Sequence, residues 1–251
     1  MFLKNKELDK RVPIPLYFQL KELIVAEIKS GQYPVDSLIP TEKELSEQFD
    51  ISRTTVRQAV TELVQEGWLY RVKSKGTFIA RQKIKQDFLQ RLETFQEQME
   101  RIGLEPSTEV LDFKFIKASK EVSENLQIEE GKQVIYLFRR RFGNGEPVVT
   151  VETYLPFEKC AFIKDQDFER VSLYDVLSAR EETRIFSAKR LVEAVEANNS
   201  DVQYLHVRKG SPIQLVHTVS VNKADVALEY SIARYRGDAS SFQLYVYVDP
   251  A

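Results

Sequence analysis

The sequence predicts an α+β protein of two domains: a small helical domain that ends in a β-hairpin, then a larger antiparallel sheet domain with helices. Two observations carry this prediction. Apolar residues recur at helical spacing in three segments of the first 80 residues, and two short β-prone runs follow. Beyond residue 91, several runs alternate apolar and polar residues, as strands with one buried face do. We expect domains at 1–81 and 92–251, joined by a polar linker at 82–91.

The composition excludes several classes of protein. A chain of 251 residues with 43% hydrophobic and 29% charged residues is neither disordered nor collagen-like. It holds no apolar run of about 18 residues and no secretory signal, so we expect a cytoplasmic protein without a membrane partner. Cys160 is the only cysteine, and with two histidines, His206 and His217, it cannot complete a zinc site. We therefore expect no metal and no cofactor.

The first two helices have clear start and stop signals. Pro15 can begin a helix, and Gly31 ends its apolar pattern. The apolar face consists of Leu16, Leu20, Leu23, Ile24 and Ile28. The second helix follows Thr41 and Glu44, whose spacing is that of a capping box, in which the two side chains satisfy each other's backbone amides.

A third helix is expected at 53–66, where Ser52 can cap its first turn and Gly67 ends it. At 100° per residue, one side is apolar and the other polar. The apolar side holds Val56, Ala59, Val60 and Leu63, and the polar side holds Arg53, Thr54, Arg57, Gln58 and Thr61. The outward face thus presents two guanidinium groups and no acid until Glu62.

A basic hairpin follows, with strands at 68–72 and 77–80 and a turn at 73–76. Residues 51–81 contain six basic and two acidic residues, although the whole chain has a net charge of −2. A basic segment in an acidic protein fits nucleic-acid binding by part of the surface. The order of helix, helix, tight turn, helix and basic hairpin is that of a winged helix-turn-helix.

This arrangement suggests which residues contact DNA. Arginine can bond bidentately to guanine in the major groove, so Arg53 and Arg57 can reach a base edge or a phosphate. Short hydroxyl side chains can reach phosphates or a thymine methyl, and lysines in the hairpin can neutralise phosphates. Gly76 has no side chain to keep its backbone from a groove. The other candidates are Ser52, Thr54, Thr55, Lys73 and Lys75. The alternative is a solvated helix beside a charged turn.

Residues 15–81 resemble the N-terminal DNA-binding domain of GntR-type transcriptional regulators. The matching segments are PLYFQLKELIVAEIKSGQ and IPTEKELSEQFDISRTTVRQAVTELVQEGWLYRVKSKGTFIA. The resemblance implies that Lys43, Arg53, Arg57 and Gly76 contact DNA. The family often has arginine at the position of Lys43.

The second domain begins with an expected helix at 92–102, and its strands are expected at 107–116, 133–142, 147–155, 188–197, 213–221, 226–235 and 241–249. Asn144-Gly145 lies between two of these strands and is the strongest short-range signal for a two-residue hairpin. Several antiparallel strands with a few helices indicate an α+β domain.

This region resembles the effector-binding domain of the HutC branch, which has a chorismate-lyase-like fold. The resemblance is carried by RRRFGNGEPVVTVETYLP, SLYDVL and ALEYSIARYRGDASSFQLYV. It is similar to amino-sugar-responsive relatives, such as N-acetylglucosamine-utilisation repressors. In these, two arginines and a serine hold a phosphate, a preceding segment approaches it through its backbone, and a glutamate and a tyrosine line the sugar pocket. The corresponding residues are Arg139, Arg141, Ser172, Thr94, Phe95, Glu229 and Tyr235.

The alternation of side chains along a strand agrees with part of this inference. Arg139 and Arg141 share a face with apolar Ile135 and Leu137. Inward guanidinium groups are costly unless paired, and an anionic ligand is one suitable partner. In the alternatives, Arg140 faces the ligand side, or the arginines pair with acids of the domain, namely Glu152 or Glu229.

One position departs from the amino-sugar-responsive pattern. Those relatives often have glutamate four residues after the proline of GEP, where this chain has Val151, and Glu152 follows it. One residue changes the face of a strand, so Glu152 either needs a bulge to point inward or does not contact the ligand. Arg236 and Asp238 either line the pocket or hold the hairpin.

Together these patterns predict a ligand-responsive transcriptional repressor and not an enzyme. We expect a homodimer on palindromic double-stranded operator DNA, because one helix reads only a few base pairs. A small anionic effector, a sugar phosphate such as an amino-sugar phosphate or else an organic acid such as urocanate, would release or reposition it. Activation in place of repression depends on where the operator lies.

Two other function classes fit the sequence less well. Lyase chemistry on a small carboxylate would need a paired acid–base set, which the second domain lacks. An architectural DNA-binding protein without a ligand would not need two inward arginines.

Overall fold

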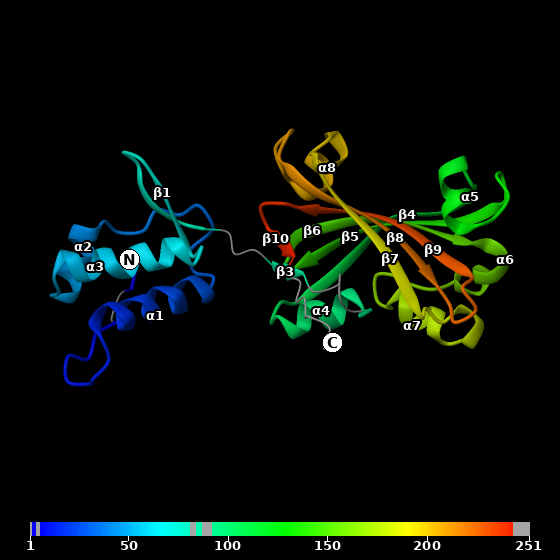
Figure 1. Ribbon diagram of the computed structural model, residues 1–251. Helices are drawn as coiled ribbons and strands as arrows, with labels where there is room; N and C mark the ends of the chain where they lie inside the picture. The colour runs from blue at the N-terminus through cyan, green and yellow to red at the C-terminus, as the bar shows by residue number, and fades with distance from the viewer. Residues whose placement is uncertain (1, 4–5, 81–83, 87–91, 243–251) are drawn as a thin grey trace, which may run out of the picture. The chain divides into compact units, whose positions relative to one another are not determined.

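The computed structural model describes residues 2–3, 6–80, 84–86 and 92–242. The chain divides into two compact units, Met1–Gln82 and Lys83–Ala251 (Figure 1). Residues 84–86, which lie inside the linker expected at 82–91, form a short strand. The remainder of the linker lies outside the described residues.

The first unit consists of three helices and a hairpin. The elements are α1 (Leu16–Lys29), α2 (Glu42–Phe49), α3 (Arg53–Gln65), β1 (Leu69–Val72) and β2 (Gly76–Ile79). Leu20 and Ile24 of α1 are buried in one core with Val60 and Leu63 of α3. The apolar faces that the sequence predicts for these helices therefore face one another.

The predicted caps fix the starts of α2 and α3. The Thr41 amide donates to Glu44 Oε2 at 2.7 Å, and the Glu44 amide donates to Thr41 Oγ1 at 3.2 Å, which completes the capping box. Ser52 Oγ accepts from the Thr55 amide at 3.1 Å. Asp50 ends α2 in the left-handed region, with φ of 50°, so the turn between the helices needs only a few residues.

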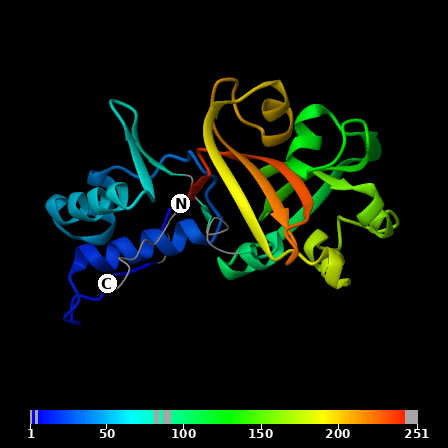
Figure 2. The same cartoon turned by 45° about the vertical axis from the view of Figure 1, so that its right-hand side comes forward.

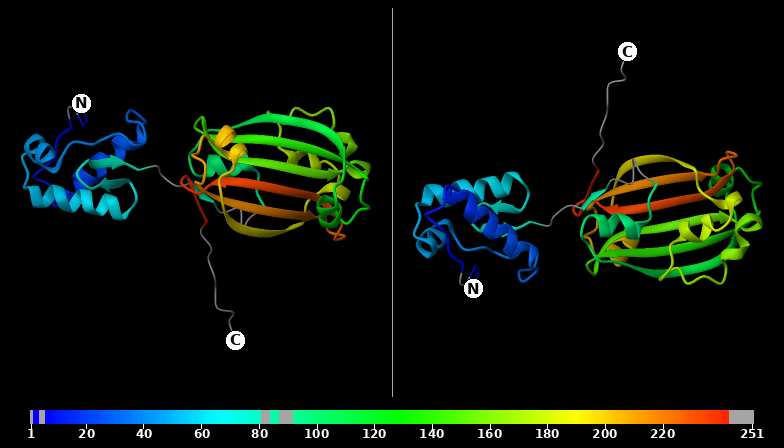
Figure 3. Two further views of the ribbon diagram at one scale, coloured as in Figure 1. Left: turned by 90° about the horizontal axis from the view of Figure 1, so that it is seen from above. Right: turned by 90° about the horizontal axis from the view of Figure 1, so that it is seen from below.

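The second unit is built on a six-stranded antiparallel sheet. Its order is β4-β5-β6-β9-β8-β7 (Figure 3). The strands are β4 (Pro106–Lys117), β5 (Gln133–Gly143), β6 (Glu146–Pro156), β7 (Ser187–Glu196), β8 (Pro212–Val221) and β9 (Ala227–Arg236). Each of these six matches its expected range within one residue at either end. The α+β class, with an antiparallel sheet in the second domain, is confirmed.

The β5–β6 connection is the predicted two-residue hairpin. Asn144 and Gly145 have φ of 51° and 75°, which is the pair of positive angles that a type I′ turn requires. The amide of Glu105 also donates to Asn144 Oδ1 at 2.8 Å, which ties the turn to the residue before β4.

Helices lie on both faces of the sheet (Figures 1 and 2). On one face, Ile135 and Leu137 of β5 pack with Leu173 and Leu177 of a helix that follows β6. The helices on this face are α4 (Phe95–Arg101), α6 (Phe157–Cys160) and α7 (Leu173–Ser178), and those on the other are α5 (Lys120–Leu126) and α8 (Asn199–Leu205). The helix expected at 92–102 begins only after Thr94, because this residue is its cap.

A separate two-stranded sheet joins distant parts of the second unit. Its strands are β3 (Ile84–Gln86) and β10 (Ser240–Phe242), which pair in parallel. The strand expected at 241–249 is thus described only at its start, and residues 243–249 lie outside the described residues. Two short 3₁₀ helices, η1 (Ala161–Ile163) and η2 (Glu181–Thr183), complete the unit.

Candidate functional site

The exposed face of α3 carries the residues that the sequence assigns to DNA. Val56, Ala59, Val60 and Leu63 are buried, as the helical wheel predicts. Arg53, Thr54 and Arg57 are consequently exposed. Thr55 and Ser52 lie at the start of the helix, where their hydroxyl oxygens are 2.8 Å apart.

Arg57 is held by an acid from the neighbouring helix. Its Nε donates to Glu42 Oε2 at 3.0 Å, and Arg71 Nη2 of β1 donates to Glu42 Oε1 at 3.1 Å. One carboxylate therefore connects α2, α3 and the hairpin. The Arg57 side chain is 69% exposed, so it remains accessible to a further partner.

The hairpin tip and the start of α2 carry the other candidates. Lys73 and Lys75 are exposed in the turn, and Lys43 lies on α2 with Nζ 3.8 Å from Glu47. Gly76 begins β2, so the turn is one residue shorter than expected. Its φ of +126° favours glycine, and an added Cβ would lie 2.6 Å from Leu38 Cδ1.

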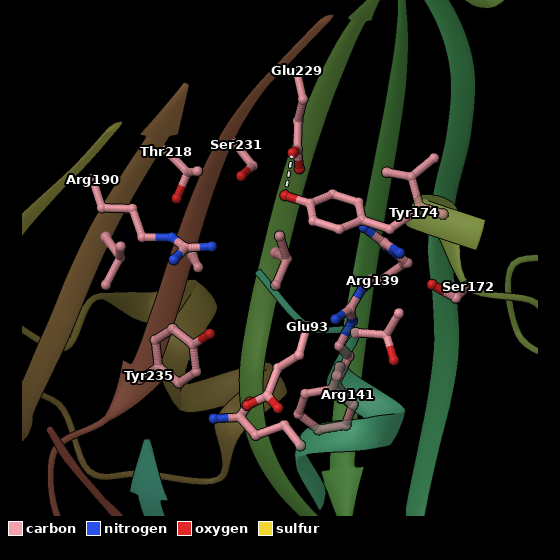
Figure 4. Close-up of a pocket in the computed structure, with 17 residues that line it drawn as sticks. Glu93, Arg139, Arg141, Ser172, Tyr174, Arg190, Thr218, Glu229, Ser231 and Tyr235 are labelled. Atoms are coloured by element: carbon pink, nitrogen blue, oxygen red, sulfur yellow. Dashed lines mark hydrogen bonds between the residues drawn. The ribbon is translucent and has the colours of Figure 1, made fainter. Parts of the chain in front are cut away.

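A pocket lies in the second unit on the sheet face that also carries α4 and α7 (Figure 4). All seven residues that the sequence predicts for the effector line it: Thr94, Phe95, Arg139, Arg141, Ser172, Glu229 and Tyr235. They come from the cap and first residue of α4, from β5, from the residue before α7, and from β9. The fold thus brings together residues that are up to about 140 positions apart in the sequence.

Arg139 is buried in the wall of this pocket, and Arg141 is half-buried beside it. Arg139 is 3% exposed, and its Nη2 donates to Thr153 Oγ1 at 3.2 Å. The Nε atoms of Arg139 and Arg141 have no hydrogen-bond partner among the described residues. Burial lowers the pKa of Arg139 well below its usual value, and the neighbouring charge of Arg141 lowers it further. The guanidinium of Arg141 lies 5.1 Å from the centre of the Phe95 ring.

Glu229, which the resemblance assigns to the sugar, is a buried acid in the pocket. It is 4% exposed, and its Oε2 accepts from Tyr174 Oη at 2.7 Å and from Ser220 Oγ at 2.8 Å. Burial raises the pKa of Tyr174, and the charge of Glu229 raises it further, so this phenol stays protonated and donates. Burial also raises the pKa of Tyr235 to about 12.

Ser172 and Thr94 precede helices that border the pocket. The Ser172 side chain makes no capping bond to α7. Thr94 Oγ1 accepts from the Glu97 amide at 3.1 Å, and the Thr94 amide donates to Glu97 Oε2 at 2.8 Å. These two bonds form a capping box and fix Phe95 beside Arg141.

Arg140 and Glu152, which the sequence leaves as alternatives, lie on the face of the sheet away from the pocket. Arg140 faces the opposite side of the sheet, where its Nε donates to Glu109 Oε2 at 2.8 Å. Glu152 lies on that side as well and accepts from Tyr136 Oη at 3.0 Å and Tyr154 Oη at 3.1 Å. Neither residue lines the pocket.

Arg236 and Asp238 hold the end of β9. Arg236 is 4% exposed, and its Nε and Nη2 donate to the two carboxylate oxygens of Asp238 at 3.1 and 2.9 Å. The geometry therefore supports the alternative in which Arg236 and Asp238 hold the hairpin and do not line the pocket.

Both units match known families. Residues 16–79 match the bacterial regulatory proteins of the gntR family, and residues 101–241 match the UTRA domain, which covers more than half of the chain. The chain belongs to the GntR family. It is a transcriptional repressor of the GntR/HutC type with a UTRA effector domain.

Individual relatives support this assignment. The HTH-type transcriptional repressor NagR of Bacillus subtilis is 33% identical over 95% of this chain and 98% of its own length. The histidine utilization repressor of Pseudomonas putida is 28% identical over 81% of each chain. The crystal structure of PhnF from Mycobacterium smegmatis has the same fold, with a TM-score of 0.74 over 93% of this chain and 99% of that one at 24% identity. The relatives from Bacillus subtilis and Pseudomonas putida are named as repressors and not as enzymes, in agreement with the sequence.

Several residues that line the pocket of the second unit were not predicted from the sequence. They are Glu93, Gln98, Val151, Leu173, Tyr174, Arg190, Val216, Thr218, Ser231 and Ala233. Tyr174 was within reach of sequence reasoning, because it belongs to the SLYDVL segment. Arg190 was not, because its strand joins the sheet four positions from β5.

Two further observations concern only the part of the chain that the structure describes. No helix there is long and apolar enough to cross a membrane. No group of three or more His, Cys, Asp or Glu residues in the same part could hold a metal ion.

Proposed function

We propose that this GntR repressor binds a palindromic operator as a homodimer. Binding of a small anionic effector in the pocket of the second unit would release the repressor from the operator or reposition it there. The effector class that we propose is sugar phosphates, with amino-sugar phosphates as the first to test. Such a regulator acts where the chromosome lies, in the cytoplasm.

The observation that carries the effector proposal is a pair of arginines whose Nε atoms are buried in the pocket wall. Arg139 and Arg141 lie on one face of β5, and the Nε of each lacks a hydrogen-bond partner among the described residues. Burying a cation is costly unless an anion compensates it. A phosphate can accept several N–H bonds from two guanidinium groups, and such charge-assisted bonds are about twice as strong as neutral ones.

The DNA-binding proposal rests on α3 and the hairpin. Exposed Arg53 and Arg57 lie one turn apart, and Ser52, Thr54 and Thr55 flank them. The hairpin adds Lys73, Lys75 and Gly76, and α2 adds Lys43. The helix would enter the major groove, and the lysines would contact phosphates. Two copies on a twofold site double these contacts.

Binding of the effector and binding of DNA must then each weaken the other. If the effector favours a conformation that binds DNA less well, DNA weakens effector binding by the same factor. This reciprocity gives the proposal a quantitative test.

The effector is tested by thermal melting of the full chain with glucosamine 6-phosphate, N-acetylglucosamine 6-phosphate, glucose 6-phosphate, the unphosphorylated sugars and urocanate. A ligand at 100 times its Kd adds about 2.7 kcal/mol to stability. We expect only phosphorylated sugars to raise Tm. A response to urocanate alone would favour the organic-acid alternative, for which the same arginines could bind a carboxylate.

The operator is tested with a duplex selected from a random-sequence pool. We expect the selected site to be palindromic, to bind two chains, and to release them when a ligand that raises Tm is added. One chain per duplex, or release that is insensitive to that ligand, would contradict the proposal.

A further inference from the structure

Strand β7 ends the six-stranded sheet, and no strand of the described residues pairs with its outer side (Figure 3). It is ten residues long, contains no proline or glycine, and pairs with β8 without a register shift. Natural proteins rarely leave so regular an edge unprotected, because its N–H and C=O groups can pair with another chain. We propose that β7 pairs antiparallel with β7 of a second copy around Leu191, so that two sheets join into one. This inference rests on the proposed homodimer and names the surface that forms it.

The strand at the opposite edge of the sheet, β4, is protected against such pairing. It begins at Pro106 and carries a register shift between Val110 and Asp112. The amide of Val110 also donates to Glu169 Oε1 at 3.0 Å. An irregular backbone and an occupied amide hinder the addition of a further strand. Because β7 has neither a proline nor a register shift, it is the edge that suits a second copy.

The pairing of β7 with β8 determines which backbone groups point outward. Directly after β7, the amide of Ala197 donates to the carbonyl of Ser211 at 2.8 Å, in the same register as the strands. Residues of an antiparallel ladder alternate in the direction of their backbone groups, so odd-numbered residues of β7 bond to β8. The N–H and C=O groups of even-numbered residues, such as Arg190 and Val192, therefore point to the open side.

Two copies of β7 must consequently pair even-numbered residues with even-numbered residues. When Arg190 of each copy lies opposite Val192 of the other, Leu191 lies on the twofold axis, opposite Leu191 of the partner subunit. Lys189 then lies opposite Glu193 of the partner subunit. Leu191 is 57% exposed in the single chain, and the other two side chains are exposed as well. Apolar pairs and opposite charges at directly opposed positions stabilise an antiparallel pair.

The two neighbouring registers lose both matches. A shift by two residues in one direction places Leu191 opposite Glu193 and Lys189 opposite Val195. A shift in the other direction places Arg190 opposite its own copy, where like charges repel. The Glu193 side chain is 51% exposed, and its Oε2 lies 3.8 Å from His217 Nε2, so it is accessible to a lysine of a second copy. The side chains of β7 therefore select the register centred on Leu191.

This interface would adjoin the effector pocket. Arg190 lines the pocket, and Val192 lies on the same face of β7 because side chains alternate along a strand. Val192 of the partner subunit would lie beside Arg190, with about 5.5 Å between the two Cα atoms. A ligand that moves β7 would thus act directly on the contact between the two copies.

Disulfide cross-linking of the full chain tests the register. Two copies of Leu191→Cys would place their Cα atoms about 4.5 Å apart, within the range of about 4.4–6.8 Å that a disulfide needs. The matched control is Val192→Cys, whose two copies are offset by two residues and lie about 8 Å apart or more, too far for a disulfide. Oxidation should therefore give a covalent dimer with the first variant and not with the second. Cys160 is buried and should not react.

Sedimentation equilibrium tests the pairing without a cross-link. Val192→Pro removes an outward N–H and no bond to β8, so the chain should keep its circular dichroism spectrum. The Kd of the dimer should rise at least about tenfold, because two hydrogen bonds are lost across the twofold axis.

A charge exchange tests the opposed side chains. Lys189→Glu and Glu193→Lys each place like charges opposite one another and should each weaken the dimer. The variant that carries both changes restores opposite charges and should restore the Kd of the wild type. This measurement also decides the matter if Val192→Pro does not fold.

Two results would overturn the inference while the wild type remains a dimer. One is a cross-link through Val192→Cys and none through Leu191→Cys. The other is a folded Val192→Pro variant, or a single charge variant, with the dimer Kd of the wild type. If the wild type sediments at 29.2 kDa and binds the operator as one chain, the proposed homodimer fails together with the inference.

Discussion

The two units place arginine in opposite environments. Arg57 of α3 has a side chain that is 69% exposed and pairs with Glu42. Arg139 of β5 is 3% exposed, and its Nε has no hydrogen-bond partner among the described residues. A surface ion pair contributes little and exchanges partners easily. A buried cation costs stability until an anion arrives. The first arrangement suits a surface that contacts many different DNA sequences. The second suits a pocket whose buried charge is stabilised when one anionic ligand binds.

The largest expected effect comes from Arg139→Met. This change removes the buried charge, so the free protein should melt at the same or a higher temperature. Effector affinity should fall by about 3 kcal/mol or more, over about a hundredfold, because two charge-assisted hydrogen bonds are worth about 1.5–3 kcal/mol each. Melting curves with and without glucose 6-phosphate measure both quantities.

Arg140→Met is the matched control on the opposite face. It breaks the contact with Glu109, so the free protein should melt at a lower temperature while effector affinity stays unchanged. If Arg139→Met binds glucose 6-phosphate as the wild type does, the arginine pair is not the phosphate site.

Next in size is Arg57→Ala. Loss of a residue that reads a base should cost about 1–3 kcal/mol of operator affinity. Fluorescence anisotropy with the selected duplex measures it. Arg11→Ala removes an exposed arginine that pairs with Asp9, and it should change operator affinity much less. Equal losses in the two variants would indicate that Arg57 contributes only general charge.

The only cysteine gives a pH dependence that is confined to the second unit. Burial raises the pKa of the Cys160 thiol from its ordinary value near 9 to about 12. Between these values the unfolded chain loses its proton first, so stability falls as pH rises. Urea unfolding of the wild type should lose about 1 kcal/mol between pH 8 and 9.5 that Cys160→Ala does not lose. An identical slope in both proteins would show that another group titrates.

The smallest effect is expected from Glu42→Gln. The change removes a negative charge next to Arg57 and Arg71 while the amide can still accept a hydrogen bond. Affinity for a scrambled duplex should rise a few-fold, and the ratio of operator to scrambled affinity should fall, because Arg57 is less firmly oriented. Anisotropy titrations with both duplexes at one salt concentration measure the ratio. An unchanged ratio would mean that Glu42 does not position Arg57.

Local patterns predicted most of the fold. Strand-like runs in the sequence located β4 to β9, and Asn144-Gly145 has the positive φ angles that its turn requires. The capping signals at Thr41 and Ser52 were equally local. The sheet order was not available from such patterns, because it depends on contacts between strands that are far apart in the sequence.

In the pocket, too, local patterns predicted some residues, whereas others depend on contacts between distant strands. Alternation placed Arg139 and Arg141 on one face, and the resemblance supplied Ser172, Glu229 and Tyr235. Alternation also showed that Val151 and Glu152 must face opposite sides, but not which side faces the pocket. Arg190 was missed because the sequence does not show that β7 is the edge strand next to β8. It also does not show that Arg190 faces the same pocket as Arg139 and Arg141.

The pairing of β3 with β10 has a practical consequence for anyone who wants to build a biosensor by fusing this effector domain to another reader of DNA. A chimera cut at residue 92, where sequence patterns place the boundary, would lose Ile84–Gln86 and leave the backbone of Ser240–Phe242 without its neighbour. An exposed strand edge of this kind invites aggregation. The junction therefore belongs before Ile84, within the few residues that separate β2 from β3.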